Sequence, residues 1–140
     1  MKSTLTEDEI EQYQLQLLQT LGYSYCNGYD IQPEGRNQER ESFGEVVLKD
    51  RLPQAISRLN PKNPHDALYQ AQREIFNIAS SDLFNNNEIF HKYLTEGITV
   101  EYQKNGETRG EPVWLIDWEH PENNEFLAVN QFTLTGCNGC

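Results

Sequence analysis

The sequence predicts an α+β fold with about four helices and a small, mostly antiparallel sheet, within a single domain over residues 1–140. Three observations carry this prediction. Apolar residues recur at helical spacing in four segments between residues 7 and 96. The last third of the chain alternates in the manner of strands and contains both tryptophans. Asn105-Gly106, a strong hairpin signal, separates two of those strands.

The first helix is expected over residues 7–21. Thr6 and Glu9 have the spacing of a capping box, in which each side chain satisfies a free backbone N–H of the other. Gly22 supplies the stop. The acids of the first turn suit the positive end of the helix, so capping explains them better than metal binding. The apolar residues that recur at helical spacing are Ile10, Tyr13, Leu17 and Leu21.

Three more helices follow. One begins near Arg51, which leaves Pro53 in its first turn, and ends at Asn60-Pro61. The next opens at Pro64, and the last is capped by Ser80 or Ser81 and ended by Gly97. Their aligned apolar residues are Leu48, Leu52, Ile56 and Leu59, then Leu68, Ala71, Ile75 and Ile78, then Leu83, Phe90 and Leu94.

The sheet is expected to contain residues 98–102, 108–118 and 126–134, with an edge strand near residues 23–29 and a polar loop over 31–43. The two long strands are apolar on both faces, a pattern typical of strands buried on both sides. Asp117, Asn130 and Gln131 are then polar groups in buried strands. An unpaired buried polar group costs about 1–3 kcal/mol, so each needs partners. These three are the candidate structural or site-supporting residues.

Composition excludes several classes. No apolar stretch approaches the roughly 20 residues of a membrane span, and the acidic start lacks the apolar core of a signal peptide. Three cysteines do not make a disulfide framework, so we expect a cytoplasmic protein without membrane contact. Cys137 and Cys140 form one C-x-x-C, which is half of a zinc site or a redox pair; a functionless tail over residues 135–140 is the simpler interpretation.

Charge argues against direct phosphate binding. The net charge is −11, whereas phosphate recognition relies on Lys and Arg. The segment 36–62 alone is net positive, with Arg36, Arg40 and four other cations, and a solvated helix face explains it more simply than a DNA footprint. No phosphate loop, G-x-S-x-G or H-E-x-x-H motif occurs, and the three histidines have no ligand-like spacing. The sequence itself therefore indicates no catalytic, cofactor or metal residue.

Four stretches resemble a known family. LIDW followed by PENNEFLAVNQFTL is similar to the N-terminal region of the R (restriction and motor) subunit of type I restriction enzymes. The likeness extends upstream to SFGEVVLKDRLPQAISRLNP at residues 42–61, to residues 67–75, and to FHKYLTEGITVEYQKNGETRGEPVWLIDW at residues 90–118. Together these segments cover nearly the whole chain and are far more specific than one short motif.

The resemblance implies the front part of a PD-(D/E)xK-like nuclease domain. In that family an Asp and a Glu-x-Lys bind Mg²⁺ and activate water for DNA cleavage, while an ATP-driven motor follows; the partners are modification and specificity subunits, with DNA bound by the whole enzyme. The catalytic residues come after the strand equivalent to residues 126–134, beginning with Arg-Pro-Asp, which this sequence lacks. We therefore expect a catalytically silent, truncated piece without a cofactor of its own, with a non-family ending TGCNGC.

One alternative stays open. An acidic domain of this size could be an interaction protein that binds a restriction complex or mimics DNA by its charge. Under the nuclease interpretation, residues 126–134 form a strand whose next partner is missing, and we expect self-association through this apolar edge.

Overall fold

The computed structural model describes residues 4–78 and 83–135, which divide into two compact units. Unit 1 comprises residues 1–46 and 125–140, and unit 2 comprises residues 47–124. The prediction of a single domain over residues 1–140 stays a prediction. No helix in the described ranges is long and apolar enough to cross a bilayer. Ser80, Ser81, Cys137 and Cys140 lie outside those ranges, as do the expected cap and residues 136–140 of the tail expected over 135–140.

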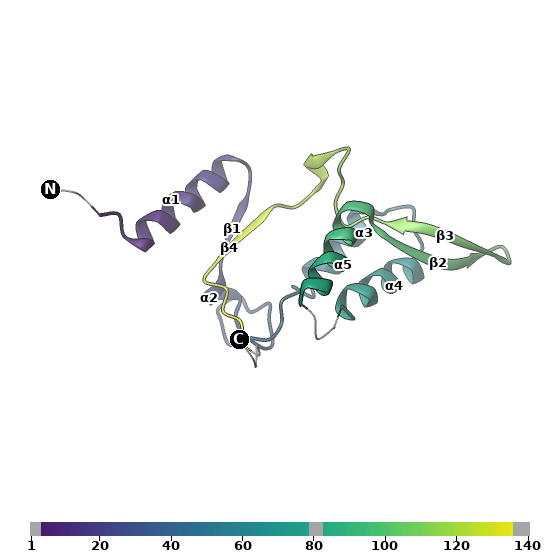
Figure 1. Cartoon of the computed structure of the whole chain (residues 1–140), viewed down its shortest axis with the longest axis horizontal. Coiled ribbons are helices and arrows are strands. Elements are labelled where there is room, and N and C mark those ends of the chain that lie inside the picture. Colours follow the sequence, from purple (N-terminus) through teal and green to yellow (C-terminus); the bar gives the residue numbers. More distant parts are fainter. Residues whose placement is uncertain (1–3, 79–82, 136–140) are drawn as a thin grey trace. The chain divides into compact units, whose positions relative to one another are not determined.

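Unit 2 contains three helices and a hairpin (Figure 1). Helix α3 spans Arg51–Leu59, α4 spans His65–Phe76 and α5 spans Leu83–Glu96. These match the predicted helices, with Pro53 in the first turn of α3 and Gly97 in the left-handed region at φ 76° after α5. Ile78 was wrongly assigned to the inner face of α4, because that helix ends at Phe76.

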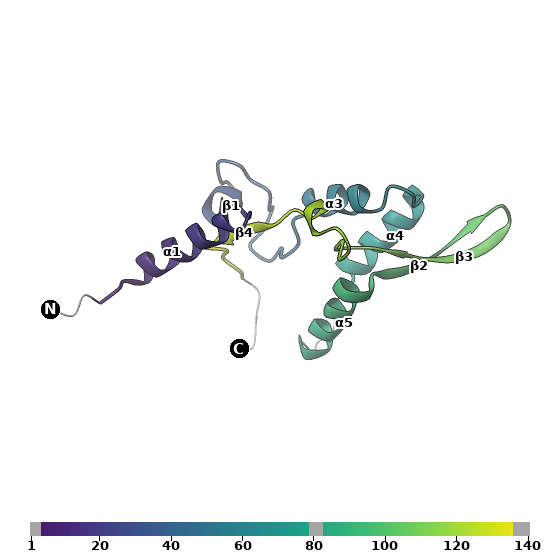
Figure 2. The same cartoon turned by 90° about the horizontal axis from the view of Figure 1, so that it is seen from above.

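The hairpin of unit 2 joins β2 (Ile98–Lys104) to β3 (Glu107–Val113). The two strands are antiparallel, and their pairing runs from Ile98 opposite Val113 to Lys104 opposite Glu107. Asn105 and Gly106 both have positive φ, 54° and 78°, as a type I′ turn requires. The hairpin prediction is confirmed, and its tip extends beyond α4 (Figure 2). The core lies between the base of the hairpin and the helices; its buried residues are Ile56, Ala67, Leu68, Ala71, Ile75, Ile98, Val100 and Val113.

The predicted strand over residues 108–118 is too long. Strand β3 ends at Val113, because its partner β2 begins at Ile98 and Gly97 turns the chain away into α5. Beyond this point Trp114 bonds to the Asn60 side chain instead of a neighbouring strand. Residues 114–118 therefore lack the two buried faces that their alternation suggested, and Trp118 is 58% exposed. A short 3₁₀ helix, Pro121–Asn123, follows.

The inner face of α5 also differs from the prediction. Phe90 is 42% exposed, whereas Ile89 and Tyr93 are half-buried. The side of α5 that carries Tyr93 is tied to α4, since the Tyr93 hydroxyl donates to the Glu74 carboxylate at 3.3 Å. Burial and the neighbouring Glu74 carboxylate raise the pKa of Tyr93, which keeps its hydroxyl protonated as a donor.

Unit 1 begins with helix α1 (Glu7–Thr20), and the predicted capping box is present: the Glu9 N–H donates to Thr6 Oγ1 at 3.2 Å, and the Thr6 N–H donates to Glu9 at 2.8 Å. These bonds to Thr6 lower the pKa of Glu9. The helix contacts β1 (Ser24–Asn27).

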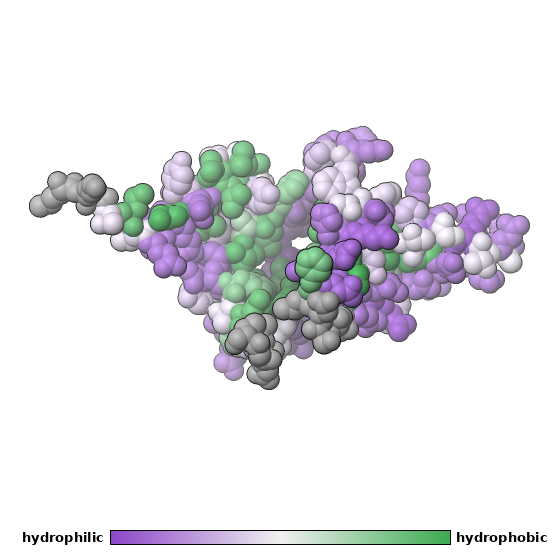
Figure 3. Space-filling view, in the orientation of Figure 1, coloured by the Kyte–Doolittle hydropathy of each residue, from purple (hydrophilic) through white to green (hydrophobic). Residues whose placement is uncertain are grey.

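The buried face of α1 is not the stripe that apolar spacing suggested. Leu15 is buried at 8%, and Glu11 and Leu18 are half-buried beside it. The stripe of Ile10, Tyr13, Leu17 and Leu21 is 45–70% exposed. Figure 3 shows apolar surface over the C-terminal end of α1 and the start of β1. Apolar spacing located the helix correctly and assigned the wrong side of it to the contact.

Strand β4 (Leu127–Asn130) pairs with β1 in a parallel ladder, from Ser24–Leu127 to Asn27–Asn130. Two predictions are corrected here. Residues 126–134 do not extend the hairpin sheet, and the strand stops at Asn130, because Gln131 has φ 52°. The edge strand expected near residues 23–29 is confirmed over residues 24–27, and helix α2 (Gly28–Ile31), which was not predicted, begins directly after it. The α+β class holds, with the sheet divided into two separate pairs of strands.

Candidate functional site

Five polar side chains meet where β1 and β4 end, and we call them the amide cluster: Glu11, Tyr25, Tyr29, Asn130 and Gln131. Asn130 Nδ2 donates to Glu11 Oε1 at 2.6 Å, and Asn130 Oδ1 accepts from the Tyr25 hydroxyl at 2.8 Å. Gln131 Nε2 donates to both Glu11 oxygens, at 3.2 and 3.0 Å, and Gln131 Oε1 accepts from the Tyr29 hydroxyl at 3.2 Å. In each amide, both the nitrogen and the oxygen are thus hydrogen-bonded.

The backbone positions these two amides. Adjacent side chains of a strand point to opposite faces, yet Asn130 and Gln131 reach the same carboxylate. The positive φ of Gln131 allows this, because it turns the chain out of the strand directly after Asn130. The turn also brings Gly28 against the backbone. A Cβ on Gly28 would lie 2.5 Å from the Asn130 carbonyl oxygen and closer still to that of Gln131, so only glycine fits here.

The hydrogen bonds of the cluster connect two segments that are distant in the sequence. Glu11 lies on α1, and its two oxygens accept amide N–H groups from the end of β4. These bonds join an N-terminal helix to a distant segment, since Glu11 precedes Asn130 by 119 positions and Gln131 by 120. Hydrogen bonds that involve a charged group contribute about 1.5–3 kcal/mol when shielded from water, and less where exposed, as Gln131 is.

The described residues contain no cluster of three potential metal ligands. Nowhere in residues 4–78 and 83–135 do three His, Cys, Asp or Glu side chains gather within reach of one metal ion. In the amide cluster, Glu11 is the single carboxylate, and amide donors occupy its oxygens. Mg²⁺ prefers octahedral oxygen coordination, which this donor-rich arrangement does not offer.

Asp117, the third predicted residue, belongs to unit 2 and organises a turn. Its Oδ1 accepts the backbone N–H groups of Glu119 and His120 at 3.1 and 2.9 Å, and its Oδ2 accepts from the Asn123 side chain at 2.9 Å. The bonds from Asn123 and His120 hold the pKa of Asp117 below its ordinary value. The predicted need for partners was met, although the residue lies in a turn and not in a strand.

One arginine is buried, which the sequence did not predict. Arg40 was assigned to a solvated helix face, yet it lies in irregular backbone and is 0% exposed. Its guanidinium donates to the carbonyls of Glu45, Phe43 and Thr133 at 3.0, 3.1 and 2.9 Å, and lies 3.9 Å from the centre of the Phe132 ring. It fixes the segment after β4. Of its two aromatic contacts, Phe43 is three positions away in the sequence and Phe132 is remote, so the sequence carried little signal of this burial.

Comparisons with known proteins give the family. The chain matches the family "Type I restriction enzyme R protein N terminus" (HSDR_N) over residues 4–139, and it belongs to that family. The resemblance found in the sequence is therefore confirmed.

Among known proteins, the chain is 38% identical over 135 residues to the type I restriction enzyme HindI endonuclease subunit of Haemophilus influenzae, covering 96% of this chain and 13% of that subunit. It is 37% identical over 131 residues to the putative type I restriction enzyme MjaIXP endonuclease subunit of Methanocaldococcus jannaschii, covering 93% and 12%. The chain thus spans about an eighth of these relatives. A weaker similarity, 33% over 89 residues, links it to the phosphoribosylformylglycinamidine synthase subunit PurL of Thermococcus sibiricus. No solved structure matches the chain significantly.

Proposed function

We propose that these 140 residues form the front of the nuclease domain in the R subunit of a type I restriction enzyme, a subunit that cuts DNA with ATP hydrolysis. The family match over residues 4–139 carries this proposal. The endonuclease subunits from H. influenzae and M. jannaschii support it, because they align along nearly the whole chain.

Within that domain, the residues described above have a positioning role. The amide cluster ties α1 to the end of β4, and Arg40 holds Phe132 and Thr133 directly after it. Under this proposal the catalytic Asp and Glu-x-Lys would follow this same strand. The two contacts would therefore fix the point from which the catalytic strand departs, while the 140 residues themselves cleave no DNA. Mg²⁺ and ATP would be bound by other parts of the whole subunit, and the modification and specificity subunits would be its partners in a cytoplasmic complex.

A chimera tests the proposal. Residues 4–139 would replace the aligned segment of the H. influenzae endonuclease subunit, to which they are 38% identical over 135 residues. The chimera would be assembled with its modification and specificity subunits and assayed for ATP-dependent plasmid cleavage. We expect cleavage well above that of a subunit without the segment. A chimera that assembles and hydrolyses ATP but does not cut would contradict the proposal.

Two variants of the chimera test the positioning role of the amide cluster, one with the cluster changed and one as its matched control. A chimera with Asn130→Ala and Gln131→Ala removes both amides from Glu11, while a chimera with Asn85→Ala and Asn87→Ala changes two amides on α5, in unit 2. We expect the first to cut more slowly than the second at equal ATP hydrolysis. Equal cleavage would remove the positioning role from the cluster.

The net charge of −11 favours a second candidate, an acidic protein that binds a restriction complex in place of DNA. The test is inhibition in trans. The purified chain would be added to an assembled type I enzyme, with the plasmid concentration varied. Inhibition that excess plasmid relieves would support the mimic. Unchanged cleavage at a large excess of the chain would leave the nuclease proposal as the single candidate.

A further inference from the structure

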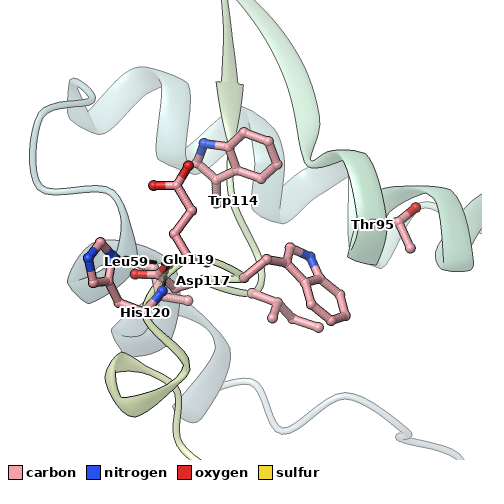
Figure 4. A pocket seen from close by; sticks show the side chains of 8 residues that line it. Leu59, Thr95, Trp114, Asp117, Glu119 and His120 are labelled. Carbon is pink, nitrogen blue, oxygen red and sulfur yellow. Dashed lines mark hydrogen bonds and ion pairs between the residues drawn. The ribbon is translucent and has the colours of Figure 1, made fainter.

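A pocket of about 550 Å³ opens in unit 2 beside the turn that Asp117 organises (Figure 4). Its lining joins three parts of the unit: Leu59 at the end of α3, Thr95 near the end of α5, and the segment Trp114–His120 without Leu115. The volume falls within the roughly 300–1,000 Å³ of small-ligand pockets. The nuclease proposal does not use it.

Two indoles define the apolar part of this pocket. Trp114 is 40% exposed and Trp118 is 58% exposed, a large aromatic surface to leave in water. The ring of Trp118 and the backbone of Trp114 are held in place. Trp118 Nε1 donates to the Leu94 carbonyl at 3.0 Å, which fixes its ring, and the Trp114 backbone is clamped on both sides by Asn60 at 2.8 Å. Rigid, exposed tryptophans lose little entropy on binding and dominate recognition sites.

The rim of the pocket is acidic. Asp117 and Glu119 both line it, and the bonds from Asn123 and His120 lower the pKa of Asp117, so this carboxylate stays ionised at neutral pH. The Glu119 side chain extends toward the ring of Trp114 (Figure 4). No hydrogen bond or ion pair of the Glu119 carboxylate occurs within the described part of the chain. Around it, residues 111–125 contain five acids and no Lys or Arg.

We propose that this pocket binds an arginine side chain of a partner protein. A guanidinium stacks on an indole face through cation–π attraction, and its planar fork donates to carboxylates at the same time. The two indoles offer the stacking surface and Glu119 offers the acceptor, while Asp117, whose oxygens accept bonds within the turn, adds negative charge beside them. A nucleic-acid ligand would also stack on the indoles, but its phosphates would meet the carboxylates of residues 111–125, while Arg58, a basic side chain beside this turn, already donates to the Asn123 carbonyl at 3.2 Å. Charge therefore selects a cationic partner.

The two tryptophans also supply the assay, because the sequence contains no others. Intrinsic fluorescence of the 140-residue chain would be titrated with acetyl-Gly-Arg-Gly-amide. The control peptide carries citrulline, which has nearly the shape of arginine without its charge. We expect a saturable change in emission with the arginine peptide, half-complete on the order of 1–10 mM, and a clearly weaker response to citrulline. Equal responses to both peptides, or no saturable change, would overturn the proposal.

Two variants, each of which removes one negative charge, locate the site. Glu119→Gln alters the pocket, and Glu107→Gln alters the exposed start of β3 beside the hairpin turn. We expect Glu119→Gln to weaken the arginine peptide about threefold and Glu107→Gln to leave its affinity unchanged. The two indole N–H resonances in the NMR spectrum report whether each variant keeps its fold and whether the peptide contacts both rings. Equal affinity of the two variants, or stronger quenching by a short oligothymidylate than by the peptide, would refute an arginine site.

Discussion

Replacing Asn60 by alanine should clearly destabilise unit 2. Asn60 is 4% exposed and lies at the end of α3. Its Nδ2 donates to the carbonyls of Ile56 and Trp114, both at 2.8 Å, and its Oδ1 accepts the Trp114 N–H at 2.8 Å. The side chain thus takes the place of a strand partner for Trp114, at the position where β3 has ended.

The magnitude follows from these three bonds. Each contributes about 0.5–1.5 kcal/mol, and a buried group left unpaired costs about 1–3 kcal/mol. Some of the freed groups near Trp114 can reach water, because this residue is 40% exposed. We therefore expect Asn60→Ala to lower the free energy of unfolding by about 2–4 kcal/mol. For a domain of this size, with a total of about 5–15 kcal/mol, that is a large fraction.

Urea denaturation followed by tryptophan emission measures the loss, since both tryptophans lie in unit 2. Asn63→Ala is the matched control: its Nδ2 makes one exposed bond to the Pro112 carbonyl at 3.3 Å, and we expect a loss of at most about 0.5 kcal/mol. The reasoning fails if Asn60→Ala costs less than about 1 kcal/mol, or no more than Asn63→Ala.

Four further predictions concern other residues. Asn130→Ala should cost about 1–3 kcal/mol in urea denaturation followed by circular dichroism, because it removes the bonds to Glu11 and Tyr25; a change below about 0.5 kcal/mol would mean that the cluster carries no stability. Arg40→Met should cost about 2–4 kcal/mol, since three carbonyls lose their donor, whereas Arg36→Met at an exposed position should be neutral; similar losses for both would contradict the burial of Arg40. The lowered pKa of Asp117 means that its contribution to stability is complete above its ordinary pKa near 4 and is lost as the pH falls through the lower folded pKa. Asp117→Asn should accordingly lose less stability than the wild type between about pH 5 and pH 3, and an identical loss would disprove this linkage. The chain should self-associate through the strand at residues 127–130, whose one partner in the described ranges is β1, and added salt should promote this by screening the charge of −11; sedimentation velocity that shows a monomer at low and high salt would exclude it.

The sequence determined the features that depend on neighbouring residues. The helix α1 with its capping box, the start of α3 near Pro53, the stop at Gly97 and the turn at Asn105-Gly106 were all predicted. Each is set by contacts within a few positions, where the identity of one side chain decides the backbone angle or the cap. The family could also be identified from sequence, because many such segments occur in order along residues 4–139.

Tertiary structure alone decided which side of an element is buried and where a strand ends. The apolar alternation of residues 113–118 predicted a strand, but β2 offered no partner beyond Ile98, so Asn60 took over the bonds of Trp114. Asn130 and Gln131 were predicted to need partners, and only the fold could supply Glu11 from 119 positions away. Arg40 lies buried because carbonyls distant in sequence surround its guanidinium. Pairing between remote segments depends on which groups the fold brings together, and the sequence around a residue does not identify a partner that is far away along the chain.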